Sequence, residues 1–138
     1  MTMTMTPKAA IVGLFSLLWA QGVLAAPSRA CLTPAARSAL ERVEAAFGPM
    51  QVVSTCRPGA TVRGTGRPSR HASGNAVDFK AGARKAAVVR WLIANHHGGI
   101  MTYRGMSHIH IDVGPRFVAL GHPNGQPNRR RRSLRASS

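Results

Sequence analysis

The segment at residues 108–113 reads His-Ile-His-Ile-Asp-Val, an uninterrupted alternation of polar and apolar side chains. Because a β-strand has a two-residue period, this pattern predicts a strand with His108, His110 and Asp112 on one face and three apolar residues on the other. Two imidazoles on one face can bind a single metal ion, or one can bind the ion while the other acts on a substrate. The alternative is an exposed polar strand face with no ligand role.

A further histidine and carboxylate lie in the segment Ser-Arg-His-Ala-Ser-Gly-Asn-Ala-Val-Asp at residues 69–78. Gly74 permits a turn between His71, at the end of an irregular stretch, and Asp78, on a predicted strand. Alone, His71 would be a solvated loop histidine, whereas Asp78 between two apolar neighbours needs a partner. With the 108–113 strand these residues offer three ligands and an open position, which is typical of catalytic zinc. Two histidines and a carboxylate also suit non-haem iron.

Two helices are predicted. Thr33-Pro34 is a helix start, with a capping hydroxyl before a proline in the first turn, and Gly48-Pro49 ends that helix. A second helix is predicted at residues 83–97. Its inward residues are expected to be Val88, Trp91, Leu92 and Ile93.

Strands are predicted at residues 50–55, 75–80, 100–104 and 108–113. Helices and strands in this order indicate a small α+β domain with an antiparallel sheet and two main helices. The remaining histidines (His96, His97 and His122) are expected to have no ligand role.

The first 25 residues are predicted to be a signal peptide, with Lys8, an apolar stretch at residues 9–20 and small residues before a cleavage point after Ala25. A membrane anchor is the alternative, but the apolar stretch is shorter than a bilayer span. Export predicts a periplasmic or secreted protein with no stable membrane span. In that oxidising compartment Cys31 and Cys56 are expected to pair, a free nucleophilic thiol being the alternative.

Positive charge dominates the chain, with 19 Lys and Arg against 4 Asp and Glu. Residues 26–120 are predicted to form the folded domain, and residues 121–138 an arginine-rich disordered tail. This charge suits an anionic surface such as a cell-wall polymer, and it is equally consistent with solubility and surface adhesion. A specific nucleic-acid partner is not expected, because the chain is predicted to be exported and only 5% of its residues are aromatic.

The pattern Ser-x-His-x-x-Gly-x-Ala-x-Asp followed by His-x-His resembles the zinc D-alanyl-D-alanine carboxypeptidase and murein endopeptidase superfamily, whose fold is shared by the hedgehog signalling domain. The resemblance covers roughly residues 50–116. It implies His71, Asp78 and His110 as zinc ligands and His108 as the catalytic histidine. It also implies that Arg57 binds the substrate carboxylate or the oxyanion.

The function implied by this resemblance is an exported zinc metallopeptidase that hydrolyses peptide bonds of peptidoglycan stem peptides. D,D-carboxypeptidase and murein endopeptidase activity both remain open. Some branches carry a glutamate base three residues before the last ligand, where this chain has Ser107. The chain therefore resembles the His-x-His branch. Ser107 also favours the alternative, a non-catalytic zinc-binding module that interacts with the cell wall.

Overall fold

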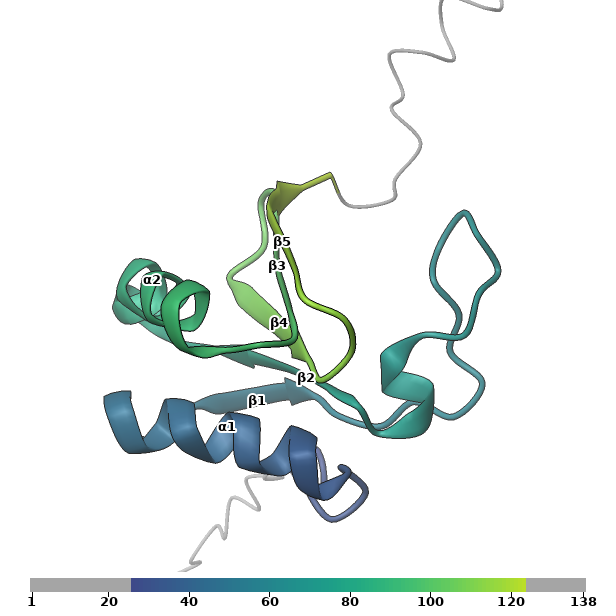
Figure 1. Ribbon diagram of the computed structural model, residues 1–138, viewed down its shortest axis with the longest axis horizontal. Helices are drawn as coiled ribbons and strands as arrows, with labels where there is room; N and C mark the ends of the chain where they lie inside the picture. The colour runs from purple at the N-terminus through teal and green to yellow at the C-terminus, as the bar shows by residue number, and fades with distance from the viewer. Residues whose placement is uncertain (1–25, 124–138) are drawn as a thin grey trace, which may run out of the picture.

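The computed structural model describes residues 26–123, so the predicted signal peptide and the tail from residue 124 onward lie outside the described residues. Within this range two α-helices and two short 3-10 helices accompany a five-stranded sheet (Figure 1). The elements are α1 (Pro34–Phe47), β1 (Gln51–Ser54), η1 (Arg70–Ser73), β2 (Ala76–Lys80), η2 (Gly82–Arg84), α2 (Lys85–Asn95), β3 (Gly99–Tyr103), β4 (His108–Asp112) and β5 (Phe117–His122).

Helix α1 has the predicted signals at both ends. The Thr33 hydroxyl accepts the N–H of Ala36, and proline follows in the first turn. Gly48 ends the helix with a φ of 81°, a backbone conformation that glycine adopts without a steric penalty. The second predicted helix is divided into η2 and α2. Its residue Ile93 is 36% exposed, so the prediction that it faces inward is wrong.

The sheet has the strand order β1-β2-β4-β3-β5. The first four strands in this order pair antiparallel, as the sequence predicts. The edge strand β5 pairs parallel with β3, so the sheet is mixed rather than antiparallel throughout. The pattern analysis did not predict β5, and this strand crosses the predicted boundary between residues 120 and 121. Its apolar residues gave no burial signal, because Val118 and Leu120 remain exposed at the sheet edge.

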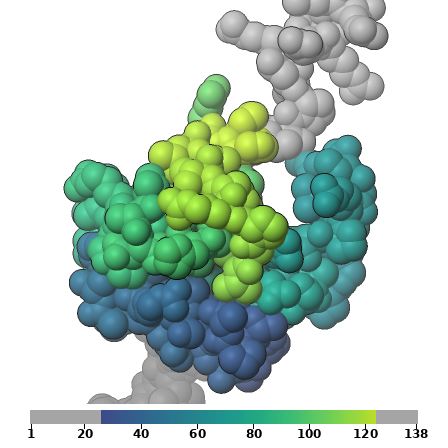
Figure 2. All heavy atoms as spheres, viewed as in Figure 1, coloured from purple at the N-terminus to yellow at the C-terminus, as the bar shows by residue number. Residues whose placement is uncertain are grey.

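The two faces of the sheet have different environments. Val77, Phe79, Ile109 and Ile111 are buried in one core with side chains of both α-helices. The polar residues of β2 and β4 therefore lie on the opposite face. In Figure 1 the segment between β1 and η1 projects away from the helices, and in Figure 2 it forms a separate lobe in teal. The functional side chains thus lie on the sheet face that neither α1 nor α2 covers.

Candidate metal centre

Three side chains meet on this face: His71, Asp78 and His110. Their inward-facing atoms lie within 4.8 Å of one another, and all three residues are buried. Asp78 Oδ1 lies 2.8 Å from His110 Nδ1 and 3.3 Å from His71 Nε2, while the two histidine nitrogens are 3.2 Å apart. Two imidazoles and a carboxylate converging at such distances can hold a divalent metal ion.

The local fold explains this convergence. Asp78 and His110 are register partners on the antiparallel strands β2 and β4. His71 enters from η1, where the Ser69 hydroxyl accepts its N–H and Gly74 ends the turn with a φ of 69°. A side chain at Gly74 would collide with the Cys31 carbonyl, so this position needs glycine on steric grounds as well. Thus the sheet supplies two of the grouped side chains and a capped turn supplies the third.

The outer nitrogen of each histidine also has a partner. His71 Nδ1 lies 2.5 Å from the carbonyl oxygen of Thr55, and His110 Nε2 lies 3.4 Å from Asp112 Oδ2. Both partners are acceptors, so they favour a proton on the outer nitrogen and a lone pair on the inner one. This is the arrangement that imidazole ligands of metal ions require. The residues present therefore fit a bound divalent ion.

In the metal-free centre, His110 is protonated and Asp78 is ionised. Burial lowers the pKa of His110, but hydrogen bonds to Asp112 and Asp78, and the charges of both, outweigh burial and raise it to about 9. Burial raises the pKa of Asp78, but hydrogen bonds from His110 and His71 outweigh it and bring the pKa well below its ordinary value. The Asp78 carboxylate and the His110 imidazolium therefore form a buried ion pair at neutral pH.

His108 is half-buried on the same strand face, two residues before His110. Burial lowers the pKa of the imidazole, and the nearby charges of Lys85 and Lys80 lower it further against the opposing effect of Asp78. His108 is therefore mainly neutral at pH 7. Its ring packs beside Tyr103, with ring centroids 5.1 Å apart. A pocket of about 460 Å³ is lined by residues that include Gln51, Lys80 and Ser107, but not by His108 or the grouped side chains.

Arg57 is attached to the centre through its backbone. Its N–H donates to the carbonyl oxygen of His71 at 2.9 Å, and its side chain is exposed. Within residues 26–123 the Arg57 guanidinium makes no hydrogen bond or ion pair with the grouped side chains. Cys56, its neighbour, forms a disulfide with Cys31, as the sequence predicts.

Sequence reasoning assigned no role to three side chains around this centre. Tyr103 stands beside His108 and also beside His122, whose ring centroid is 6.3 Å away. Asp112 is buried behind His110, although it belongs to the same alternating pattern that identified the histidines. His96, interpreted as a helix-end residue, is 3% exposed, and its Nε2 lies 2.8 Å from the Asp112 carbonyl oxygen. The two-residue period of β3 and β4 was the available signal for Tyr103 and Asp112.

Comparison with known proteins gives one match. A family model described as Peptidase M15 matches residues 13–112, a range that contains the three grouped side chains. No curated protein and no solved structure matches the chain. Among the described residues, no helix has the length and apolar character needed to cross a membrane.

Proposed function

Because the chain belongs to the peptidase M15 family, we propose that it is an exported zinc peptidase that hydrolyses peptide bonds of peptidoglycan stem peptides. The observation that carries this proposal is the grouping of His71, Asp78 and His110 on the uncovered sheet face, with His108 beside them. The family match gives the class of reaction, a metal-dependent peptide hydrolysis.

The zinc ligands in this proposal are His71 Nε2, Asp78 Oδ1 and His110 Nδ1. Three protein ligands leave a coordination position open, which distinguishes a catalytic site from a structural one. A zinc ion held there supplies a Lewis acid that activates water toward a peptide carbonyl. Zinc is preferred to iron because the family reaction is a hydrolysis and needs no change of redox state; elemental analysis of the purified protein distinguishes the two.

His108 is the proton-transfer group. It lies on the strand that carries His110, on the same face, and its half-buried ring is open to a substrate lying across the sheet. A neutral imidazole takes a proton from the attacking water and returns it to the leaving amine. This role replaces the glutamate base of other branches, since Ser107 has no titratable group. Tyr103 packs against the ring and restricts its orientation.

Arg57 stabilises negative charge on the substrate. Its exposed guanidinium extends from a backbone that is hydrogen-bonded to His71, so the cation is tied to the turn that carries a proposed ligand. A cation near the scissile carbonyl lowers the energy of the developing oxyanion. The same group can bind the terminal carboxylate of a stem peptide, and the length of the substrate decides which contact is made.

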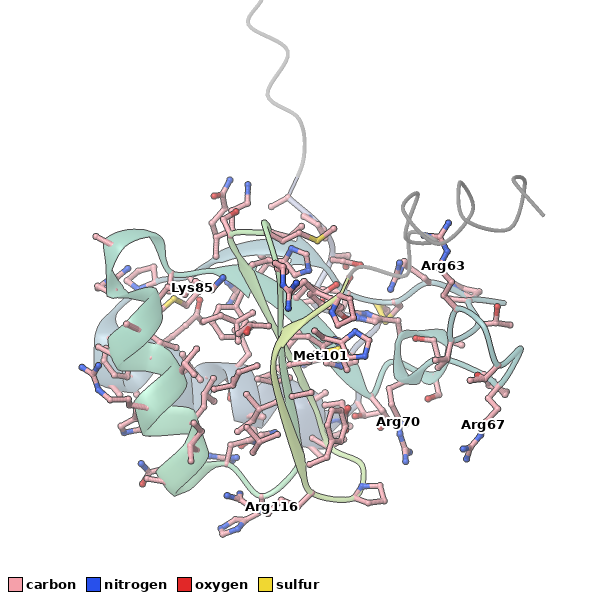
Figure 3. The ribbon with its side chains drawn as sticks, turned by 90° about the horizontal axis from the view of Figure 1, so that it is seen from above. Arg63, Arg67, Arg70, Lys85, Met101 and Arg116 are labelled. Carbon is pink, nitrogen blue, oxygen red and sulfur yellow. A yellow bond between two sulfur atoms is a disulfide. The ribbon has the colours of Figure 1, made fainter. Side chains whose placement is uncertain are left out.

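The positive charge of the protein and its expected location outside the cytoplasm both support an acidic cell-wall substrate. Arg63, Arg67 and Arg70 lie on the side of the sheet away from α2 (Figure 3), and only four carboxylates occur in the whole chain. Stem peptides carry free carboxylates, so the positive surface attracts them at low salt. The Cys31–Cys56 disulfide is consistent with an oxidising, extracytoplasmic location.

Mass spectrometry of purified muropeptides incubated with the zinc-loaded chain tests the proposal. His71→Ala removes a proposed ligand, and His97→Ala removes an exposed histidine as the matched control. We expect the wild type and His97→Ala to act alike and His71→Ala to be inactive. Release of terminal D-Ala identifies a carboxypeptidase, and splitting of cross-linked dimers identifies an endopeptidase. An unchanged digest from folded, zinc-loaded wild type would instead support the non-catalytic wall-binding module that Ser107 favours.

A further inference from the structure

We propose that Asp112 is a positioning residue of the metal centre, which fixes the nitrogen that His110 presents to the metal. This inference rests on the proposed function, because it assigns Asp112 a role toward an ion held by His110. Asp112 itself is not one of the three grouped side chains that would hold the ion.

The Asp112 carboxylate is enclosed by donors. Oδ1 accepts the N–H of Gly114 at 2.7 Å and the N–H of Gly99 at 3.3 Å. Oδ2 faces His110 Nε2 at 3.4 Å. The residue is 3% exposed. A buried carboxylate with two backbone donors on one oxygen cannot rotate without losing those bonds, so the other oxygen stays directed at His110.

The neighbouring backbone leaves space for this carboxylate. A side chain at Gly99 would collide with Asp112 Oδ2 and with the Phe117 ring. A side chain at Gly98 would collide with the Asp112 carbonyl oxygen, to which His96 Nε2 is hydrogen-bonded. The Gly98-Gly99 pair therefore allows β3 to pair closely beside Asp112, with Gly99 as its register partner on β3.

The chemical consequence is a choice of tautomer. In the metal-loaded centre the ion would replace the proton on His110 Nδ1. The remaining proton on Nε2 is then attracted to Asp112 Oδ2, and the Nδ1 lone pair is directed toward the site between Asp78 and His71. Asparagine at position 112 cannot reproduce this arrangement, because it has one acceptor oxygen and one donor nitrogen. In either orientation of the amide, its NH2 group faces at least one of the N–H groups from which the Asp112 carboxylate accepts a hydrogen bond, so two donors face each other. Asp112→Asn therefore removes the constraint while keeping the size of the side chain.

Zinc competition against a chromophoric chelator tests this inference with wild type, Asp112→Asn and Thr102→Val. Thr102 is a matched control, because its buried hydroxyl accepts a backbone N–H from Gly121 on the same sheet and faces away from the centre. We expect zinc affinity to fall about 10- to 100-fold in Asp112→Asn, the usual loss for an outer partner of a histidine ligand. Thr102→Val should bind zinc as the wild type does.

The visible absorption of the Co²⁺-loaded protein gives a second readout that a loss of stability alone would not change. We expect altered band positions in Asp112→Asn and unchanged bands in Thr102→Val. Equal zinc affinity and identical Co²⁺ spectra in wild type and Asp112→Asn would overturn the inference. A wild type that binds neither metal would instead overturn the proposed function.

Nitrogen-15 NMR of the zinc-loaded wild type keeps the inference testable if Asp112→Asn does not fold. The expected spectrum has a protonated Nε2 and a metal-coordinated Nδ1 at His110. Coordination through Nε2 would contradict the role given to Asp112, whatever the variants do.

Discussion

Asp78 and His110 face each other across the β2–β4 ladder, with Asp78 Oδ1 2.8 Å from His110 Nδ1. Their positions are fixed by backbone pairing rather than by a loop, and the apolar residues that alternate with them on β2 and β4 point into the core. Two of the three grouped side chains are therefore held on paired interior strands of the sheet, which suits a metal site with demanding geometry.

Replacing Asp78 by asparagine should remove most of the zinc affinity. The amide keeps the shape of the side chain but loses the charge that offsets the cation. We expect the affinity to fall by more than about 100-fold, beyond the usual loss for an outer partner. Competition with a chelator measures it. Glu41→Gln, which neutralises an exposed carboxylate on α1, should leave affinity unchanged. Wild-type affinity in Asp78→Asn would exclude Asp78 as a ligand.

The stability of the metal-free chain should fall as pH rises from 6.5 to 9. The His110 pKa is raised from 6.5 to about 9, so its stabilising contribution is complete below pH 6.5 and is lost as pH passes through 9. The Asp78 pKa is lowered, so its contribution is present above pH 3.8 and is lost in acid. Thermal unfolding in the presence of a chelator measures this loss. Tm should fall by about 4–8 °C for each ~1 kcal/mol by which the free energy of unfolding decreases.

Excess zinc should reverse this pH dependence near neutrality, because zinc and the proton compete for His110 Nδ1. The Asp78→Asn variant provides the control for the metal-free chain. Without the Asp78 carboxylate, the decline in stability toward pH 9 should become shallower. A wild-type Tm that is constant from pH 6 to pH 9 in chelator would contradict the ion pair.

His108→Ala should lower kcat by about 10²- to 10⁴-fold, the range for loss of a general acid–base. Zinc content should remain that of the wild type, because His108 is not among the proposed ligands. The control is His122→Ala, which removes an exposed histidine whose ring also lies near Tyr103. Loss of zinc together with activity would make His108 a ligand, and unchanged kcat would assign proton transfer to another group.

Breaking the disulfide should destabilise the fold and weaken metal binding together. The Cys31–Cys56 bridge closes a 25-residue separation, and such bridges contribute about 2–4 kcal/mol. Cys56 also directly follows Thr55, whose carbonyl oxygen holds His71 Nδ1. Urea unfolding and zinc competition on a Cys31→Ser, Cys56→Ser double variant should show both losses. Stability equal to that of the wild type would show that the bridge contributes little.

The sequence predicted the two strands that hold Asp78 and His110, because each has a local signal, whereas the short helix η1 that carries His71 was not predicted. The alternation at residues 108–113 predicted β4, and the hydroxyl and proline at Thr33-Pro34 predicted the start of α1. The residue pattern also suggested that His71 and Asp78 join a histidine of the 108–113 strand, and the family resemblance identified that histidine as His110. Local periodicity assigns a face to a side chain, but it does not reveal which strands are neighbours.

The features that were missed depend on tertiary contacts. β5 is a short edge strand whose exposed side chains show no burial pattern, and its parallel pairing with β3 has no local signature. Asp112 was assigned to the correct face, but its enclosure by Gly99 and Gly114 depends on the pairing of β3 with β4 beside it. His96 was interpreted from its position at a helix end, whereas its burial follows from its contact with β4.

Removal and restoration of the metal in a single sample tests the central claim most directly. The chain without residues 1–25 is assayed on cross-linked muropeptides by mass spectrometry as purified, after dialysis against a chelator, and after addition of one equivalent of zinc. The account predicts cleavage in the first and third samples and none in the second. Cleavage that persists in the fully metal-free, folded chain would contradict it.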